Sequence, residues 1–132
     1  MENKIYDFNK ICDKVKQLDS EIWFAGVINQ RGRLVAGGIK EGIKPLSSKR
    51  DDEMLFMELA LRVKMRKEFD KQLGRVNFAM ASRGRSMEMS IPIGDDILYI
   101  IGEPSVNYTE IPNAVFEIIE EWKVILIIYC DK

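Results

Sequence analysis

Few residues in this 132-residue chain are placed to do acid–base or nucleophilic chemistry. The sequence contains no histidine, which excludes Ser–His and Cys–His pairs, imidazole metal ligands and an imidazole general base. Two groups of adjacent carboxylates remain as candidates, Asp51-Asp52-Glu53 and Asp95-Asp96. The first is typical of a helix start and the second of a turn, so both groups have structural uses. We therefore predict no catalytic residue and no activity as an enzyme.

The sequence also lacks a pattern for a metal ion or a cofactor. Cys12 and Cys130 are the only two cysteines and lie at opposite ends of the chain, which argues against a zinc site and a disulfide framework. No Gly-Lys-Ser/Thr motif of a phosphate-binding loop is present. No signal peptide is evident, and no apolar run approaches the roughly 20 residues of a membrane span. We expect no cofactor, no metal site and a cytoplasmic location.

Charge is distributed unevenly, although the net charge is only −1. Residues 62–85 carry eight cations and two acids, whereas residues 88–132 carry nine acids and two lysines. Such asymmetry can steer an anionic partner to one face, but we favour basic and acidic surfaces that face each other between subunits or are solvated. No aromatic residue interleaves with the cations at the 82–85 turn, so nucleic acid is a weak candidate partner. Five cations are candidate partner-binding residues: Arg62, Arg66, Lys67, Arg83 and Arg85.

The elements that would position these residues begin with a helix and a hairpin. Apolar residues recur every three or four positions over residues 3–18, which predicts an amphipathic helix with Cys12 on its buried stripe. Residues 22–28 are apolar on both parities, which predicts a central strand buried on both faces. A turn at residues 29–32 leads to a returning strand at 33–36. The glycines that follow either end this strand or allow close approach of another backbone.

A long helix is predicted at residues 51–73, after a cationic loop at residues 39–50 that is either flexible or a partner-binding loop. The first half of the helix is apolar nearly all round. Packing on a sheet needs only one apolar stripe, so the second stripe predicts another buried contact, either within the chain or with a dimer partner. We predict a homodimer whose interface includes Leu55, Phe56, Leu59 and Val63.

Three strands follow at residues 76–81, 87–93 and 97–101, because apolar residues alternate or run continuously there. Pro92 places the middle strand at a sheet edge or makes its end irregular. A helix begins near Pro112, and residues 124–129 are either the end of this helix or a strand. The predicted fold is α+β, a single domain of residues 1–132 in which a five-stranded antiparallel sheet has flanking helices, in the order α-β-β-α-β-β-β-α.

This order of elements resembles the roadblock/dynein light chain superfamily, which has a profilin-like fold. The resemblance is strongest at Phe24-Ala-Gly-Val-Ile-Asn-Gln-Arg-Gly-Arg-Leu-Val-Ala-Gly-Gly38, which is similar to the first hairpin of that family, and at residues 87–101, which are similar to its last hairpin. The chain is also similar to small uncharacterised archaeal proteins with Phe-Ala-Gly-Val and a Gly-Gly before a basic loop.

The resemblance implies a dimeric, non-enzymatic interaction module that serves as a platform for small GTPases. It carries over no catalytic residue. Residues 124–129 and the basic half of the long helix depart from the family pattern. Two other functions remain open. A PAS-like small-molecule sensor also has five antiparallel strands, but its helices cluster between the second and third strands, and a nucleic-acid-binding protein would use residues 62–85.

Overall fold

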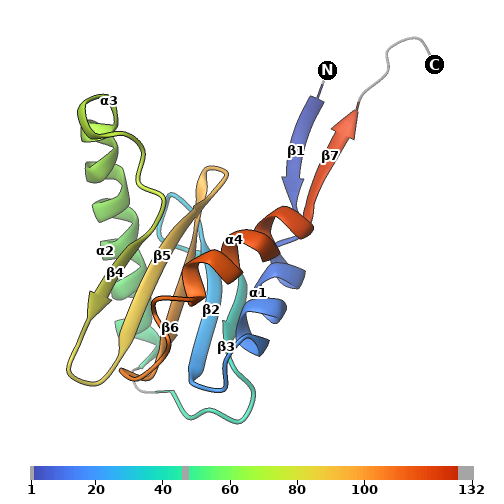
Figure 1. Cartoon of the computed structure of the whole chain (residues 1–132). Helices are drawn as coiled ribbons and strands as arrows, with labels where there is room; N and C mark the ends of the chain where they lie inside the picture. The colour runs from blue at the N-terminus through green and yellow to red at the C-terminus, as the bar shows by residue number, and fades with distance from the viewer. Residues whose placement is uncertain (1, 46–47, 128–132) are drawn as a thin grey trace.

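The structure is a computed structural model that describes residues 2–45 and 48–127 (Figure 1). Apolar and polar periodicities divide this part of the chain into the following elements: β1 (Glu2–Tyr6), α1 (Phe8–Gln17), β2 (Ile22–Ile28), β3 (Leu34–Ile39), α2 (Lys49–Arg66), the 3-10 helix η1 (Lys67–Phe69), α3 (Asp70–Leu73), β4 (Ala79–Ser82), β5 (Met87–Ile93), β6 (Asp96–Gly102), α4 (Ile111–Glu121) and β7 (Lys123–Ile127).

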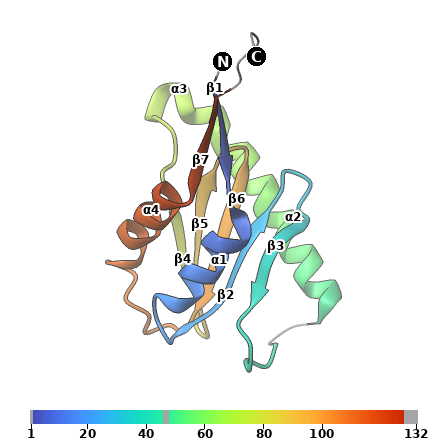
Figure 2. The same cartoon turned by 90° about the vertical axis from the view of Figure 1, so that its right-hand side faces the viewer.

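A five-stranded antiparallel sheet in the order β3-β2-β6-β5-β4 forms the middle layer of the molecule. Helices α1 and α4 cover one face of the sheet and α2 covers the other (Figures 1 and 2). The predicted α+β class and the five-stranded sheet are confirmed. The strand at residues 22–28 is interior, as its two apolar parities predict, since β2 pairs with both β3 and β6.

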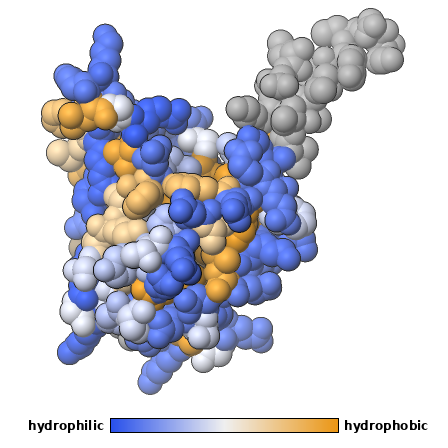
Figure 3. Space-filling model, viewed as in Figure 1, coloured by the Kyte–Doolittle hydropathy of each residue, from blue (hydrophilic) through white to orange (hydrophobic). Residues whose placement is uncertain are grey.

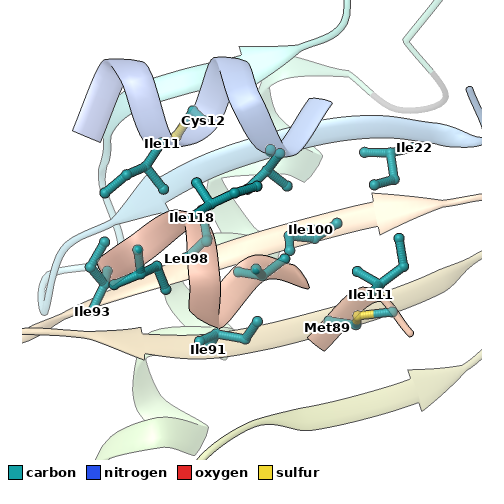
Figure 4. Packing of buried hydrophobic residues seen from close by; sticks show 14 of the residues in the cluster. Ile11, Cys12, Ile22, Met89, Ile91, Ile93, Leu98, Ile100, Ile111 and Ile118 are labelled. Carbon is teal, nitrogen blue, oxygen red and sulfur yellow. The ribbon is translucent and has the colours of Figure 1, made fainter. Parts of the chain in front are cut away.

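The core is divided by the sheet into two clusters. The larger cluster lies under α1 and α4, where alternate side chains of β5 and β6 meet the helices (Figure 4). The smaller cluster lies under α2 and contains Ile28, Phe56, Leu59, Ile97 and Tyr99. Fully burying side chains of this size contributes roughly 1.5–3 kcal/mol each. The two clusters fix α2 on one face and the α1–α4 pair on the other.

The N-terminal helix is shorter than residues 3–18, and that prediction is wrong for residues 3–6. These residues belong to β1, which pairs antiparallel with β7 in a separate two-stranded ribbon that projects from the body (Figure 1). The side chain of Asp7 accepts a hydrogen bond from the Lys10 backbone N–H at 3.2 Å and so starts α1 at Phe8. Ile5 and Phe8 are three residues apart, as in a helix, although the cap at Asp7, which begins the helix, lies between them.

The choice left open for residues 124–129 is decided for the first four, which lie in β7. The other two, together with Cys130, lie outside the described residues.

The long helix also differs from its prediction. It begins at Lys49, where the Ser48 hydroxyl accepts a hydrogen bond from the Asp51 backbone N–H at 3.1 Å, and α2 gives way at Lys67 to η1 and α3.

Two strand details have simple causes. Gly37 and Gly38 do not end β3, which continues to Ile39, but Gly37 does allow the close approach that was the other prediction. A Cβ atom at Gly37 would lie 2.7 Å from the Cys12 Sγ atom of α1 and would collide with the Ala25 carbonyl oxygen. Pro92 lies in β5, which is an interior strand of the sheet. The pairing of β4 with β5 stops at Ser90 and does not reach Pro92, so that no N–H of Pro92 is needed there.

The fully buried thiol of Cys12 gives the first testable prediction. Burial raises its pKa to about 11, so the neutral thiol is favoured by folding. The unfolded thiol ionises near its usual value of 9.0, and this stabilisation is complete below that pH and lost as the pH rises towards 11. We expect the free energy of unfolding to fall by on the order of 2 kcal/mol between these two pH values.

Urea denaturation across that pH range checks this expectation, with Cys12→Ala as the control. The Cys12→Ala variant is less stable throughout because it leaves a small void, but the part of the pH dependence that comes from the thiol disappears. The prediction would be contradicted if the free energy of unfolding depended on pH equally in the wild-type protein and the Cys12→Ala variant.

Candidate functional site: the outer face of α2 and the edge of β3

Helix α2 is apolar on two faces, and the predicted interface residues lie on the inner one. Phe56 and Leu59 are buried in the cluster under α2, with Leu55 and Val63 partly buried against it. These four side chains pack on the sheet of their own chain. The large apolar side chains of α2 that remain exposed form a different set. We call this set the outer row of α2; it consists of Met54, Met57, Leu61 and Met65.

The outer row repeats at intervals of three and four residues, so its members share one side of the helix. Met57 and Leu61 expose 60% and 57% of their surface. Large apolar side chains are seldom gathered in such a row on the surface of a monomer unless the row meets a partner. The sequence predicted a second apolar face of this helix and an interface of Leu55, Phe56, Leu59 and Val63, but these four pack against the cluster under α2, and the exposed row consists of other residues.

Strand β3 is an edge of the main sheet and lies beside the outer row. It pairs with β2 alone among the described strands, and Leu34, Val35 and Ile39 on it are exposed. The turn before β3 contacts the helix, because a Cβ atom at Gly32 would lie 2.6 Å from the Met57 Cα atom. The edge strand and the helix therefore form one continuous surface.

A groove of about 770 Å³ runs between β3 and the N-terminal half of α2. Its walls include Leu34 and Ile39 from the strand and Leu55, Phe56 and Met57 from the helix. Its floor is aromatic, where the rings of Phe24 and Phe56 have centroids 5.7 Å apart and Tyr99 stands edge-on to both. The groove thus exposes an apolar surface at the edge of the sheet.

A buried carboxylate lies at one end of this groove. Glu88 of β5 is only 5% exposed, and its Oε2 atom accepts a hydrogen bond from Arg83 Nε at 2.7 Å. Its Oε1 atom lies 3.6 Å from Arg62 of α2, whose guanidinium is also 3.2 Å from Glu58. Burial and the nearby Glu88 carboxylate hold the pKa of Tyr99 well above its usual value.

The Arg62–Glu88–Arg83 cluster joins α2 to the β4–β5 turn. The alternation of β5 predicted a half-buried strand, which would leave Glu88 on its exposed side, yet α2 and the two arginines cover it. The sequence did contain a signal for this ion pair: Glu88 lies among apolar residues of a strand, five residues after Arg83.

The predicted partner-binding cations separate into three places. Arg62 and Arg83 are both paired with Glu88. Arg66 and Lys67 line a second cavity, of about 480 Å³, at the C-terminal half of α2. Arg85 is exposed in the β4–β5 turn and lines neither cavity. The structure therefore does not bring these five residues together as one site.

Within residues 2–45 and 48–127, no three Cys, Asp or Glu side chains are grouped as metal ligands would be. Among the described helices, none is both long enough and apolar enough to cross a bilayer.

The fold is similar to that of several solved structures. The roadblock/LC7 domain from Streptomyces avermitilis is 8% identical with a TM-score of 0.67, over 87% of this chain and 93% of that chain. The gliding protein MglB from Thermus thermophilus is 14% identical with a TM-score of 0.59, over 84% of this chain and 87% of that chain. Profilin from Schizosaccharomyces pombe is 11% identical with a TM-score of 0.59, over 87% of this chain and 95% of that chain.

These likenesses confirm the predicted roadblock-like and profilin-like fold. A search of curated proteins finds none that matches the sequence. The sequence profile of DUF6659, a family of unknown function, matches residues 1–126. The chain therefore belongs to the DUF6659 family.

Proposed function

We propose that this chain is a single roadblock-like domain that acts as a non-enzymatic interaction module. In this proposal the domain forms a homodimer through the outer row of α2 and the edge of β3, and the dimer serves as a platform for a protein partner. The class of partner implied by the fold's relatives is a small GTPase. The observation that supports the proposal most strongly is the apolar row on α2 beside an unpaired strand edge.

The energetic argument starts from the exposed side chains. Covering a large apolar side chain contributes roughly 1.5–3 kcal/mol, and the outer row of α2 supplies four such side chains. Three of them are methionines, whose flexible thioether chains adapt to a facing surface. Two copies related by a two-fold axis would place outer row against outer row.

The backbone argument concerns β3. An exposed strand edge presents unpaired N–H and C=O groups, which pair readily with another strand. Antiparallel pairing of β3 with β3 of a second copy would join two sheets into one and bring the groove of each copy against the other's helix. The exposed Leu34, Val35 and Ile39 would be covered in the same step. A second copy therefore satisfies the apolar and the polar groups of this surface together.

Light scattering at micromolar concentration tests the dimer. We expect the wild-type protein to have the mass of two chains and the Met57→Glu/Leu61→Glu variant to have the mass of one. Losing two buried side chains, at about 3 kcal/mol or more, weakens association by at least about 100-fold. The control is Tyr108→Glu, which places one negative charge at an exposed side chain before α4, on the opposite face of the sheet.

The same pair of proteins tests the platform. Affinity capture with the wild-type protein, in GTP and in GDP, should retain a small GTPase in one nucleotide state, and the monomeric variant should retain much less. A single-chain mass for the wild-type protein would refute the dimer. Turnover of GTP by the purified protein, abolished by one substitution in this chain, would refute the non-enzymatic role.

A further inference from the structure

A second cavity lies at the C-terminal half of α2, away from the proposed dimer surface. It has a volume of about 480 Å³, within the range of about 300–1,000 Å³ that is usual for small-molecule sites. Its walls come from the β2–β3 turn, α2, the segment from α3 to β4, and the β5–β6 hairpin. None of its described lining residues is shared with the groove beside β3. An inference about this cavity therefore goes beyond the proposed dimer.

The lining of the cavity is rich in cations. No described carboxylate lies within ion-pair distance of any of the five, which are Arg31, Lys64, Arg66, Lys67 and Arg75. Arg66 is partly buried, and burial together with the neighbouring Arg62 lowers its pKa. A bound anion would offset this crowding of positive charge.

The lining of the same cavity also contains hydrogen-bond acceptors. Asp95 and Asp96 of the β5–β6 hairpin line the cavity with Asp70 of α3. Burial and the negative charge of the adjacent Asp95 raise the pKa of Asp96. A hydrogen-bond donor of a ligand would offset this repulsion between the two carboxylates. None of these carboxylates forms an ion pair with a described cation of the lining, so both kinds of group remain available to a ligand.

Two uncharged polar side chains also belong to the lining, Gln30 and Ser90. Ser90 of β5 is 8% exposed. The Gln30 side-chain amide donates a hydrogen bond to the Asp95 carbonyl oxygen at 3.3 Å, which ties the β2–β3 turn to the β5–β6 hairpin. A hydroxyl in the lining of a cavity can donate a hydrogen bond to a ligand or accept one from it.

We propose that this cavity binds a small phosphorylated molecule that also carries N–H donors, of the size and chemistry of a mononucleotide. The phosphate would lie against Arg66, Lys67 and Arg75, since guanidinium and ammonium groups bind phosphate oxygens through charge-assisted hydrogen bonds. The base amino group would donate to the carboxylates of the hairpin. A ligand with only one of these groups would leave either the cations or the carboxylates of the lining unmatched.

Titration calorimetry of the full chain tests the proposal, with AMP and GMP as probes and ribose 5-phosphate, adenosine and a phosphoserine peptide for comparison. We expect AMP or GMP to bind with one site per chain. Ribose 5-phosphate, which lacks the base, and adenosine, which lacks the phosphate, should each bind about tenfold more weakly or worse. Asp96→Asn should weaken the nucleotide and leave ribose 5-phosphate unchanged.

Charge variants separate this site from general attraction of anions. Arg66→Gln and Lys67→Gln should each weaken the nucleotide about tenfold, as expected for the loss of one charge-assisted contact. Lys14→Gln removes an exposed cation of α1, on the opposite face of the sheet, and should have no effect. Circular dichroism and thermal melting of each variant show that the fold is kept, and Arg66 and Lys67 provide independent tests if one variant fails to fold.

Three results would overturn the proposal. The first is no binding of either nucleotide at millimolar concentration. The second is equal weakening by Lys14→Gln and Lys67→Gln, which would show attraction to net charge alone. The third is tighter binding of the phosphoserine peptide than of either nucleotide, which would assign the cavity to a phosphorylated protein. Because the dimer is measured by mass in the absence of ligand, failure here and failure of the proposed dimer are distinguishable.

Discussion

Replacing Gly37 by alanine is expected to lower the free energy of unfolding by about 3–4 kcal/mol, a large part of the 5–15 kcal/mol of a typical domain. Gly37 has a φ of +74°, which costs a residue with a Cβ atom about 1–2 kcal/mol. The added methyl group would also lie 2.7 Å from Cys12 Sγ and collide with the Ala25 carbonyl oxygen. Overpacking of this kind costs a further 1–3 kcal/mol, roughly. Urea denaturation followed by circular dichroism measures the loss.

Two other glycines separate the causes of this effect. Gly38→Ala places a side chain at a φ of +148° with no atom within 4 Å, so that it carries backbone strain without a collision and should cost about 1 kcal/mol. Gly84→Ala lies in the β4–β5 turn, also with no atom within 4 Å and without an unusual φ, and should change stability by less than about 0.5 kcal/mol. Equal losses at Gly37 and Gly38 would show that contact with α1 is not the cause.

Replacing Glu88 by glutamine should give the second large loss, about 2–3 kcal/mol. The substitution keeps the shape of the side chain but leaves Arg62 and Arg83 without their shared carboxylate. Breaking a fully buried pair costs roughly 3–5 kcal/mol. The side chains of Arg62 and Arg83 are 35% and 54% exposed, so water screens part of the effect and a smaller loss is expected.

Chemical denaturation of Glu88→Gln beside Glu58→Gln is the measurement. Glu58 also pairs with Arg62 but is 59% exposed, and its substitution should cost less than about 0.5 kcal/mol. A loss at Glu88 no greater than the loss at Glu58 would mean that burial of the carboxylate contributes little. In that case α2 would be held on the sheet by its apolar contacts alone.

The sequence predicted those elements whose patterns are decided locally. Residues 22–28 are apolar on both parities, and both faces of β2 are covered by helices. Gly94-Asp-Asp96 was a turn signal between two strands and forms the β5–β6 hairpin. The N-terminal strand was missed because its partner, β7, lies at the other end of the chain, and pairing over that separation leaves no periodic signal within residues 3–6.

The candidate site was less predictable for a similar reason. The composition of α2 revealed two apolar faces, but only its packing on Ile28, Ile97 and Tyr99 shows that Phe56 and Leu59 point inwards. The cations around Arg62 formed one block in the sequence. The position of Glu88 under α2 divides this block into cations that pair with a carboxylate and cations that line the second cavity. Such assignments depend on which segments meet in space.

The strand order β3-β2-β6-β5-β4 also bears on how the chain folds. Strands β2 and β3 form one hairpin, and β4, β5 and β6 form a meander, so each unit pairs neighbours along the chain. Among the described strands, the two units pair with each other only between β2 and β6, across a segment that contains the whole of α2. Closing so long a loop costs entropy before the pairing compensates for it. The β2–β6 seam is therefore the step expected to limit the folding rate, and residues along it, such as Val27 and Leu98, are where substitutions should slow folding rather than merely speed unfolding.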